Sequence, residues 1–313
     1  MHGLTEIEHV RSAPVGQPPS AMRVWFEATR PRTLPAAVAP VLVGTALAWR
    51  EDALRLSAAI ACLGFALLVQ VGTNFANDYY DAQKGADTAE RVGPRRAVAS
   101  GLVTPGAMRA AMIAVFATAF LCGLTLMAYG GWPLLVVGVL SIACGVAYTG
   151  GPYPLAYHGL GDLFVFIFFG LVAVVATTYV QTGELLLVAV VAGAGVGALA
   201  TNILVANNYR DVETDTKAGK RTLLVKWGRD YGRAQFAVAH AMAVGAPLTL
   251  VLLGSINGFA AGVLVFIAAA VGIVQGGRLA AVKNPSDCIV LLGATGKWLA
   301  LYGVLLACAI AWR

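Results

Sequence analysis

The chain has 313 residues, of which 58% are hydrophobic and only 12% are charged. An ordinary soluble domain has about 25% charged residues, and a soluble protein this apolar would need a larger core than a chain of this length can enclose. The composition therefore excludes an ordinary soluble domain and predicts an all-α, polytopic membrane protein.

The uncharged runs predict nine transmembrane helices, because about 18 apolar residues are enough to mark a candidate membrane span. The predicted spans are 34–49, 56–80, 106–129, 131–149, 159–180, 184–206, 234–254, 257–277 and 289–312. Residues 1–22 are polar and lack a hydrophobic signal core, so they are predicted to be a disordered tail without a cleaved signal peptide. Residues 23–313 are then predicted to form a single transmembrane domain.

The net charge of +6 is explained by membrane topology rather than by nucleic-acid binding. Lys and Arg are concentrated in the N-terminal segment and in the loops after the second, sixth and eighth predicted spans, whereas the opposite side carries Arg50, Arg55 and Arg313. Positive loops mark the cytoplasmic side of a membrane protein. The sequence therefore predicts a cytoplasmic N-terminus and no nucleic-acid partner.

Acidic and amide side chains gather at the end of the second predicted span. On a helix that continues to Asp81, one face carries four of them at positions i, i+3, i+4 and i+7: Asn74, Asn77, Asp78 and Asp81. Gly85 is predicted to stop this helix, which places Asp87 in the following loop. Ionisable groups in a membrane segment are costly, so this cluster indicates a functional site.

The loop after the fourth predicted span is rich in aromatic residues, with three tyrosines and a histidine between Tyr148 and His158. Two interpretations are open. The rings, Tyr153 among them, either form a fixed wall beside a site or belong to an aromatic belt at the membrane surface.

A second polar cluster ends the sixth predicted span, after the close-packing pattern Gly193-x-x-x-Gly197. Asn208, Asp211 and Asp215 are spaced for one helix face, and Lys220 and Arg221 follow. The pattern Asn-(Asp/Asn)-Tyr-x-Asp occurs at 77–81 and again at 207–211. This repetition predicts two pseudo-repeated four-helix halves plus a ninth helix.

The two clusters together indicate a Mg²⁺–diphosphate site on the cytoplasmic side. Carboxylate and amide oxygens without His or Cys are the ligands that Mg²⁺ prefers. Basic side chains beside them suit phosphate oxygens. They are Lys84, Arg91, Arg95, Arg96, Lys220 and Arg221. The sequence shows no P-loop, dinucleotide-binding or serine-nucleophile pattern.

At these residues the chain resembles the UbiA superfamily of intramembrane aromatic prenyltransferases, with Asn77-x-x-x-Asp81 and Asp211-x-x-x-Asp215 as its acidic motifs. Gly85 stands where the family usually has a third acid, so that role is expected to pass to Asp87. Finer stretches are similar to the branch that acts on 1,4-dihydroxy-2-naphthoate. They are 30–40, 77–87 with 91–95, 148–155 with 159–162, and 207–211 with 219–223.

The resemblance implies transfer of a polyprenyl chain from a polyprenyl diphosphate to 1,4-dihydroxy-2-naphthoate, with loss of carboxylate and diphosphate, in menaquinone biosynthesis. It implies a multi-pass enzyme of a bacterial cytoplasmic membrane, with its active site facing the cytoplasm and no obligate protein partner. Mg²⁺ is the implied cofactor, and Mn²⁺ is expected to substitute for it.

The resemblance also implies roles for particular residues. The implied metal ligands are Asn77, Asp78, Asp81, Asp87, Asp211 and Asp215. The implied diphosphate-binding residues are Asn77, Lys84, Arg91, Arg95, Asn208, Lys220 and Arg221. Asp81 and Asp211 are implied to be catalytic, and Tyr148 and Tyr153 are expected to shield an allylic cation.

Two alternatives stay open at this point. One is prenyl transfer to another aromatic acceptor, such as 4-hydroxybenzoate. The other is a cation-coupled transporter, a class in which intramembrane acids and repeats also occur. A transporter site is expected near the middle of the membrane, whereas these acids lie at one end of their spans beside phosphate-binding residues.

Overall fold

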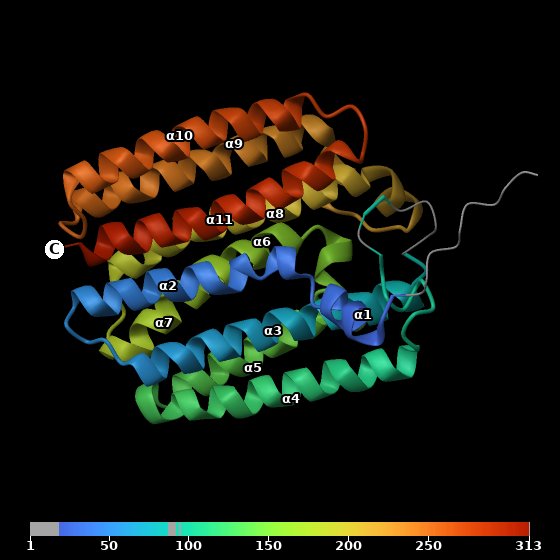
Figure 1. Ribbon diagram of the computed structural model, residues 1–313, viewed down its shortest axis with the longest axis horizontal. Helices are drawn as coiled ribbons and strands as arrows, with labels where there is room; N and C mark the ends of the chain where they lie inside the picture. Colours follow the sequence, from blue (N-terminus) through green and yellow to red (C-terminus); the bar gives the residue numbers. More distant parts are fainter. Residues whose placement is uncertain (1–18, 87–91, 94, 313) are drawn as a thin grey trace, which may run out of the picture.

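The computed structural model describes residues 19–86, 92–93 and 95–312, and every element in these residues is helical (Figure 1). The elements are α1 (Ala21–Ala28), η1 (Pro31–Thr33), α2 (Pro35–Arg50), α3 (Leu56–Gln83), α4 (Pro105–Gly130), α5 (Trp132–Ala147), η2 (Leu155–His158), α6 (Gly161–Phe166), η3 (Ile167–Val172), α7 (Ala173–Thr182), α8 (Leu187–Lys217), α9 (Leu223–Leu252), α10 (Gly258–Ala280) and α11 (Asp287–Ala311). η3 is a π-helical turn that joins α6 and α7 into one continuous rod.

The prediction of an all-helical, integral membrane protein is confirmed. Seven helical segments in the described residues are long and apolar enough to cross a membrane. An eighth results if α1, η1 and α2, which are bent by 52° at their junction, count as one span. α5 is apolar but shorter, so nine membrane spans and a cytoplasmic N-terminus stay predictions.

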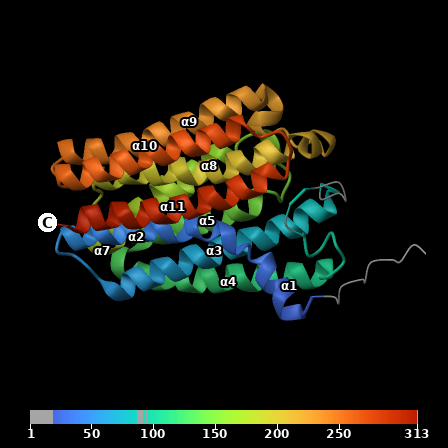
Figure 2. The same ribbon diagram turned by 45° about the horizontal axis from the view of Figure 1, so that its top comes forward.

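The bend between α1 and α2 has a local cause in the sequence. Pro31 and Pro35 each begin a helical segment, and Arg30, directly before Pro31, adopts a left-handed backbone with φ of 52°. A left-handed conformation is uncommon for a residue other than glycine. The chain therefore turns sharply between α1 and α2, and α1 contacts α3 (Figure 2).

α3 and α8 both continue through their polar clusters, which is the helical continuation that the one-face spacing predicted. Each then ends at a glycine with positive φ, Gly85 after α3 and Gly219 after α8. A backbone bond closes each end, from Ala86 N–H to Asp81 C=O and from Lys220 N–H to Asp215 C=O. Both helices therefore end with the same capping geometry directly after their acidic clusters. The two ends lie at the same end of the bundle (Figure 1).

Two helix contacts recur in the two halves of the chain. α3 packs along α4 as α8 packs along α9, and α2 packs against α3 as α7 packs against α8. α11 lies between the halves and contacts both α2 and α8 (Figure 1). The two pseudo-repeated halves with a ninth helix stay a prediction.

Small residues let the α6–η3–α7 rod approach α8 closely. A Cβ atom at Gly170 in η3 would lie 2.5 Å from both Gly193 O and Gly197 Cα. The Gly193-x-x-x-Gly197 pattern therefore marks a real helix contact, in which backbone meets backbone.

We expect Gly170→Ala to destabilise the folded protein by about 1–3 kcal/mol, because the added methyl group overlaps backbone atoms that have little room to move. Gly276→Ala on α10 is the matched control, since nothing lies within 4 Å of a Cβ built there. Thermal unfolding in detergent measures both. Equal melting temperatures for the two variants would contradict the packing argument.

Candidate active site

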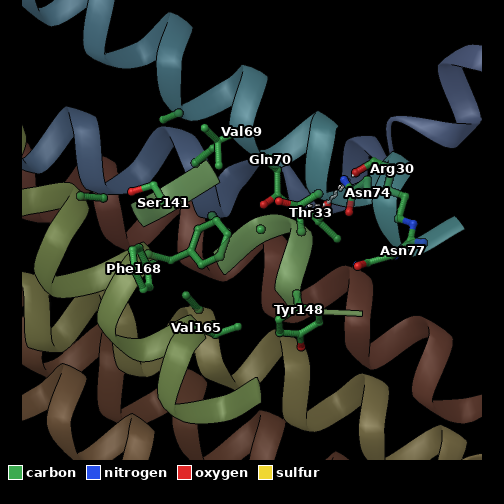
Figure 3. A pocket seen from close by; sticks show the side chains of 18 of the residues that line it. Arg30, Thr33, Val69, Gln70, Asn74, Asn77, Ser141, Tyr148, Val165 and Phe168 are labelled. Atoms are coloured by element: carbon green, nitrogen blue, oxygen red, sulfur yellow. Dashed lines mark hydrogen bonds between the residues drawn. The ribbon is translucent and has the colours of Figure 1, made fainter. Parts of the chain in front are cut away.

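A cavity of about 690 Å³ runs along α3, between α2, α5, the α6–η3–α7 rod and α8. In Figure 3, Arg30 and Asn77 lie at one end of it, Val69 and Phe168 lie toward the other end, and Gln70 and Tyr148 lie between. The cavity therefore passes from a polar end, where the acidic clusters are, into an apolar interior.

The first acidic cluster is held by side chains from two loops. The hydroxyl of Tyr157 donates to Asp81 at 2.9 Å, and Arg96 lies 3.6 Å from the other oxygen of that carboxylate. Thr149 donates its hydroxyl to the amide oxygen of Asn77 at 2.9 Å. Asp81 is only 3% exposed, so these groups replace much of its lost hydration.

Asp78 performs a separate task in the same cluster. Its two oxygens accept the backbone N–H groups of Ala97 and Val98, at 3.0 and 3.1 Å. The carboxylate thereby fixes the loop that follows α3 and carries Arg95 and Arg96. Asp78 still lines the cavity, and its predicted role as a metal ligand stays a prediction.

The second cluster is organised by a buried arginine. Arg210 is 3% exposed and donates to both oxygens of Asp211 at 2.6 Å, and it also donates to the amide oxygen of Asn207 at 2.7 Å. Lys220 lies 3.8 Å from a carboxylate oxygen of Asp215. Every acid of this cluster is thus paired with a cation.

The two clusters meet around Tyr157. Lys84, which follows α3, lies 4.5 Å from the centre of the Tyr157 ring, and Lys220, which follows α8, lies 5.6 Å from it. The backbone carbonyl of Tyr157 also accepts the N–H of Arg221 at 2.9 Å. Partial burial lowers the pKa of Lys84. The negative charge of Asp81 raises this pKa, and the positive charge of Lys220 lowers it further.

Several residues predicted from the sequence lie together at the polar end, and others lie elsewhere. Those that line the cavity are Asn77, Asp78, Asp81, Arg95, Tyr148 and Lys220. Asp211 and Asp215 lie beside it, paired with cavity-lining Arg210 and Lys220. Asn208 is buried within α8, whereas Lys84 and Arg221 are exposed.

Tyr153 lies apart from the cavity lining. It is 57% exposed and stacks on the ring of His158, with 3.6 Å between ring centres. Of the two tyrosines predicted to shield a cation, only Tyr148 lines the cavity. Asp87 and Arg91 lie outside the described residues.

Sequence reasoning did not assign site roles to Tyr157, Arg210 or Asn207. Tyr157 stands in the same aromatic loop as Tyr148, but no spacing rule connects it to Asp81. Arg210 and Asn207 are part of the repeated five-residue pattern, which was the available signal.

The donor atoms at the polar end fit a hard divalent cation such as Mg²⁺. The candidate ligands are carboxylate and amide oxygens, of the type that Mg²⁺ prefers. No group of three His, Cys, Asp or Glu side chains in the described residues has the geometry of a metal site. The acids instead contact Arg96, Arg210 and Lys220, so cationic charge already stands next to them.

Comparison with the sequences of known proteins identifies the family. Residues 37–298 match the sequence model of the UbiA prenyltransferase family. A protein of Mycobacterium tuberculosis named 1,4-dihydroxy-2-naphthoate octaprenyltransferase is 38% identical over 92% of this chain and 96% of its own length. A protein of the same name from Bacillus subtilis is 33% identical over 93% of each chain.

Solved structures share the fold at much lower identity. A UbiA homologue from Archaeoglobus fulgidus bound to GPP and Mg²⁺ is 15% identical, with a TM-score of 0.68 over 91% of this chain and 99% of that one. A UbiA homologue from Aeropyrum pernix is 18% identical, with a TM-score of 0.65 over 86% of this chain and 96% of that one.

Proposed function

Because the chain belongs to the UbiA prenyltransferase family, we propose that it transfers a polyprenyl chain from a polyprenyl diphosphate to 1,4-dihydroxy-2-naphthoate. The carboxylate leaves as CO₂ and diphosphate is released, which gives the quinol form, demethylmenaquinol, for menaquinone biosynthesis. The observation that carries this proposal is a single cavity with paired acids and cations at one end and an apolar interior beyond them.

The polar end suits the diphosphate of the donor. Asn77, Asp81, Asp211 and Asp215 would hold Mg²⁺, with Asp87 as a further proposed ligand. When bound, the ion neutralises the charge that develops on the departing diphosphate. Arg95 and Lys220 line this end and would bind phosphate oxygens, and the predicted roles of Lys84, Arg91, Asn208 and Arg221 belong to the same proposal.

The apolar interior suits the hydrocarbon tail and the reacting carbon. As the donor's C–O bond breaks, its electron pair leaves with the diphosphate. The ring carbon that bears the carboxylate forms the new C–C bond, and the electrons of the lost C–CO₂ bond return to the ring. Apolar walls exclude water, which would otherwise capture the cation, and the face of Tyr148 supplies electron density beside it.

We further propose that the protein lies in the cytoplasmic membrane of a bacterium, with the polar end of the cavity on the cytoplasmic side. This orientation rests on the distribution of Lys and Arg in the loops. The polar clusters lie in the last turns of α3 and α8, which reach the same end of the bundle (Figure 1), and this favours an enzyme over a cation-coupled transporter.

A product assay tests the proposed function. Purified protein in detergent is incubated with Mg²⁺, a series of polyprenyl diphosphates, and either 1,4-dihydroxy-2-naphthoate or 4-hydroxybenzoate. We expect a product whose mass equals the dihydroxynaphthoate plus the prenyl chain, less CO₂. Product from 4-hydroxybenzoate alone would reassign the acceptor, and absence of product from every acceptor would contradict the proposed reaction.

A further inference from the structure

Gln70 is a buried polar residue of the cavity wall with no role in the site described so far. It lies on α3 on the same face as Asn74, Asn77 and Asp81. The residue is 6% exposed and stands between the polar end and the apolar interior (Figure 3). A primary amide at such a depth is costly unless both its ends are hydrogen-bonded.

The hydrogen bonds around Thr33 fix the orientation of the Gln70 amide. The Thr33 hydroxyl donates its single hydrogen to the carbonyl of Arg30 at 3.0 Å. It must therefore accept from its other neighbours, which are Gln70 Nε2 at 2.9 Å and Asn74 Nδ2 at 3.3 Å. The NH₂ group of Gln70 thus points to Thr33.

The other end of the amide is left for a ligand. Gln70 Oε1 is buried and has no hydrogen-bond partner in the described part of the chain. Because Nε2 is anchored to Thr33, the amide cannot turn over to satisfy Oε1 without losing that bond. The cavity therefore presents one fixed acceptor atom that requires a hydrogen-bond donor.

The chemistry of the two substrates decides which of them can supply that donor. A prenyl diphosphate complexed with a metal ion offers hydrocarbon and acceptor oxygens. The aromatic acceptor named for the relatives carries two hydroxyl groups. We propose that Gln70 Oε1 accepts a hydrogen bond from a ring hydroxyl of the aromatic acceptor and so fixes its position in the cavity, an inference that rests on the proposed function.

The location of Gln70 gives this bond a positioning effect. Gln70 on α3 and Tyr148 at the end of α5 face the same part of the cavity (Figure 3). A ring held by Gln70 lies between the polar end, where the diphosphate departs, and the apolar interior that takes the tail. An aromatic molecule that lacks this hydroxyl leaves Gln70 Oε1 buried without a partner, so the site binds that molecule more weakly.

The test compares dissociation constants for 1,4-dihydroxy-2-naphthoate and its two monomethyl ethers, with an unreactive thio-analogue of the prenyl diphosphate bound. In the wild-type protein we expect one ether to bind about tenfold more weakly than the parent compound. In Gln70→Met the parent is expected to weaken to the level of that ether, so the ratio falls to about one. Affinity for the thio-analogue should not change, and this measurement also reports a folded site.

Gln275→Met is the matched control. Gln275 is likewise a buried glutamine whose Nε2 donates to a neighbour, the carbonyl of Ala294 at 3.2 Å, but it lies on α10 away from the cavity lining. This variant should keep the wild-type ratio between ether and parent. A loss of the ratio in both variants would point to general loosening of the bundle and overturn the assignment.

The remaining outcomes separate the inference from the proposed function. If both ethers bind wild-type protein as tightly as the parent, no hydroxyl contacts Oε1 and the inference fails while the reaction stands. The inference also fails if Gln70→Met keeps the wild-type ratio between the dissociation constants of the ether and the parent compound. If the protein prenylates 4-hydroxybenzoate instead, the proposed function fails, and the ratio for that phenol and its methyl ether then decides the role of Gln70.

Discussion

Asp81→Asn is expected to lower kcat for prenyl transfer by about 100- to 1,000-fold, the range found when a group that stabilises developing charge is removed. Asparagine has nearly the shape of aspartate and can still accept the hydrogen bond from Tyr157. It lacks the negative charge that would hold a divalent cation beside the diphosphate. Asp211→Asn is expected to have an effect of the same size from the second cluster.

The control for these variants is Asp230→Asn on α9, whose side chain is 93% exposed and pairs with Arg233 at the surface. It makes the same chemical change away from the cavity and should leave kcat unchanged. Initial rates with saturating substrates, together with size-exclusion profiles, measure all three variants. Turnover near the wild-type level in Asp81→Asn or Asp211→Asn would refute the proposed metal site.

Removal of divalent cations is expected to abolish prenyl transfer while the protein stays folded. We expect activity to require the ion, because the carboxylates alone would repel the diphosphate. The fold does not depend on it to the same degree, because Arg96, Arg210 and Lys220 already compensate the acids. EDTA should therefore remove activity and change the melting temperature little.

Restoration distinguishes this effect from damage by the chelator. Added Mg²⁺ should return full activity, and we expect Mn²⁺ to do so in part. EDTA saturated with Mg²⁺ beforehand is the control and should have no effect. Full activity in EDTA, after the protein has been passed through a chelating resin, would show that the reaction proceeds without a divalent ion.

The parts of the fold that depend on local pattern were predictable from the sequence. Apolar runs located the helices, and the one-face spacing of Asn74 to Asp81 correctly extended a helix through its polar end. Gly85 was correctly identified as the helix stop, because its positive φ is a property of one residue. The Gly193-x-x-x-Gly197 contact was also visible as a pattern.

The parts that depend on distant segments were not predictable in the same way. Tyr157 meets Asp81 only because the loop after α5 folds over the end of α3. The partner of Asn74 was not predictable for the same reason: its amide donates to the carbonyl of Thr29, in the turn that holds the left-handed Arg30. Such contacts are set by tertiary packing, which a spacing along one helix does not contain.

The π-helical turn of η3 determines how the rod between α6 and α7 faces the cavity. In a regular α-helix every fourth residue advances about 40° around the axis, so a row spaced by four winds onto the opposite face within a few turns. The residues of this rod that line the cavity nevertheless keep a spacing of four over its whole length, in two adjacent rows. One row is Phe164, Phe168, Val172, Ala176 and Val180, and the other is Val165, Phe169, Ala173 and Thr177.

In the wider π turn, midway along the rod, each residue rotates less around the helix axis than in an α-helix. The turn therefore cancels part of the angular drift. The helix is thus brought back into phase with the cavity halfway along its length. The close approach of Gly170 to α8 occurs at the same turn, on the side that faces α8. One extra residue in the turn therefore gives the substrate a straight apolar wall, where an uninterrupted α-helix would have turned that wall away.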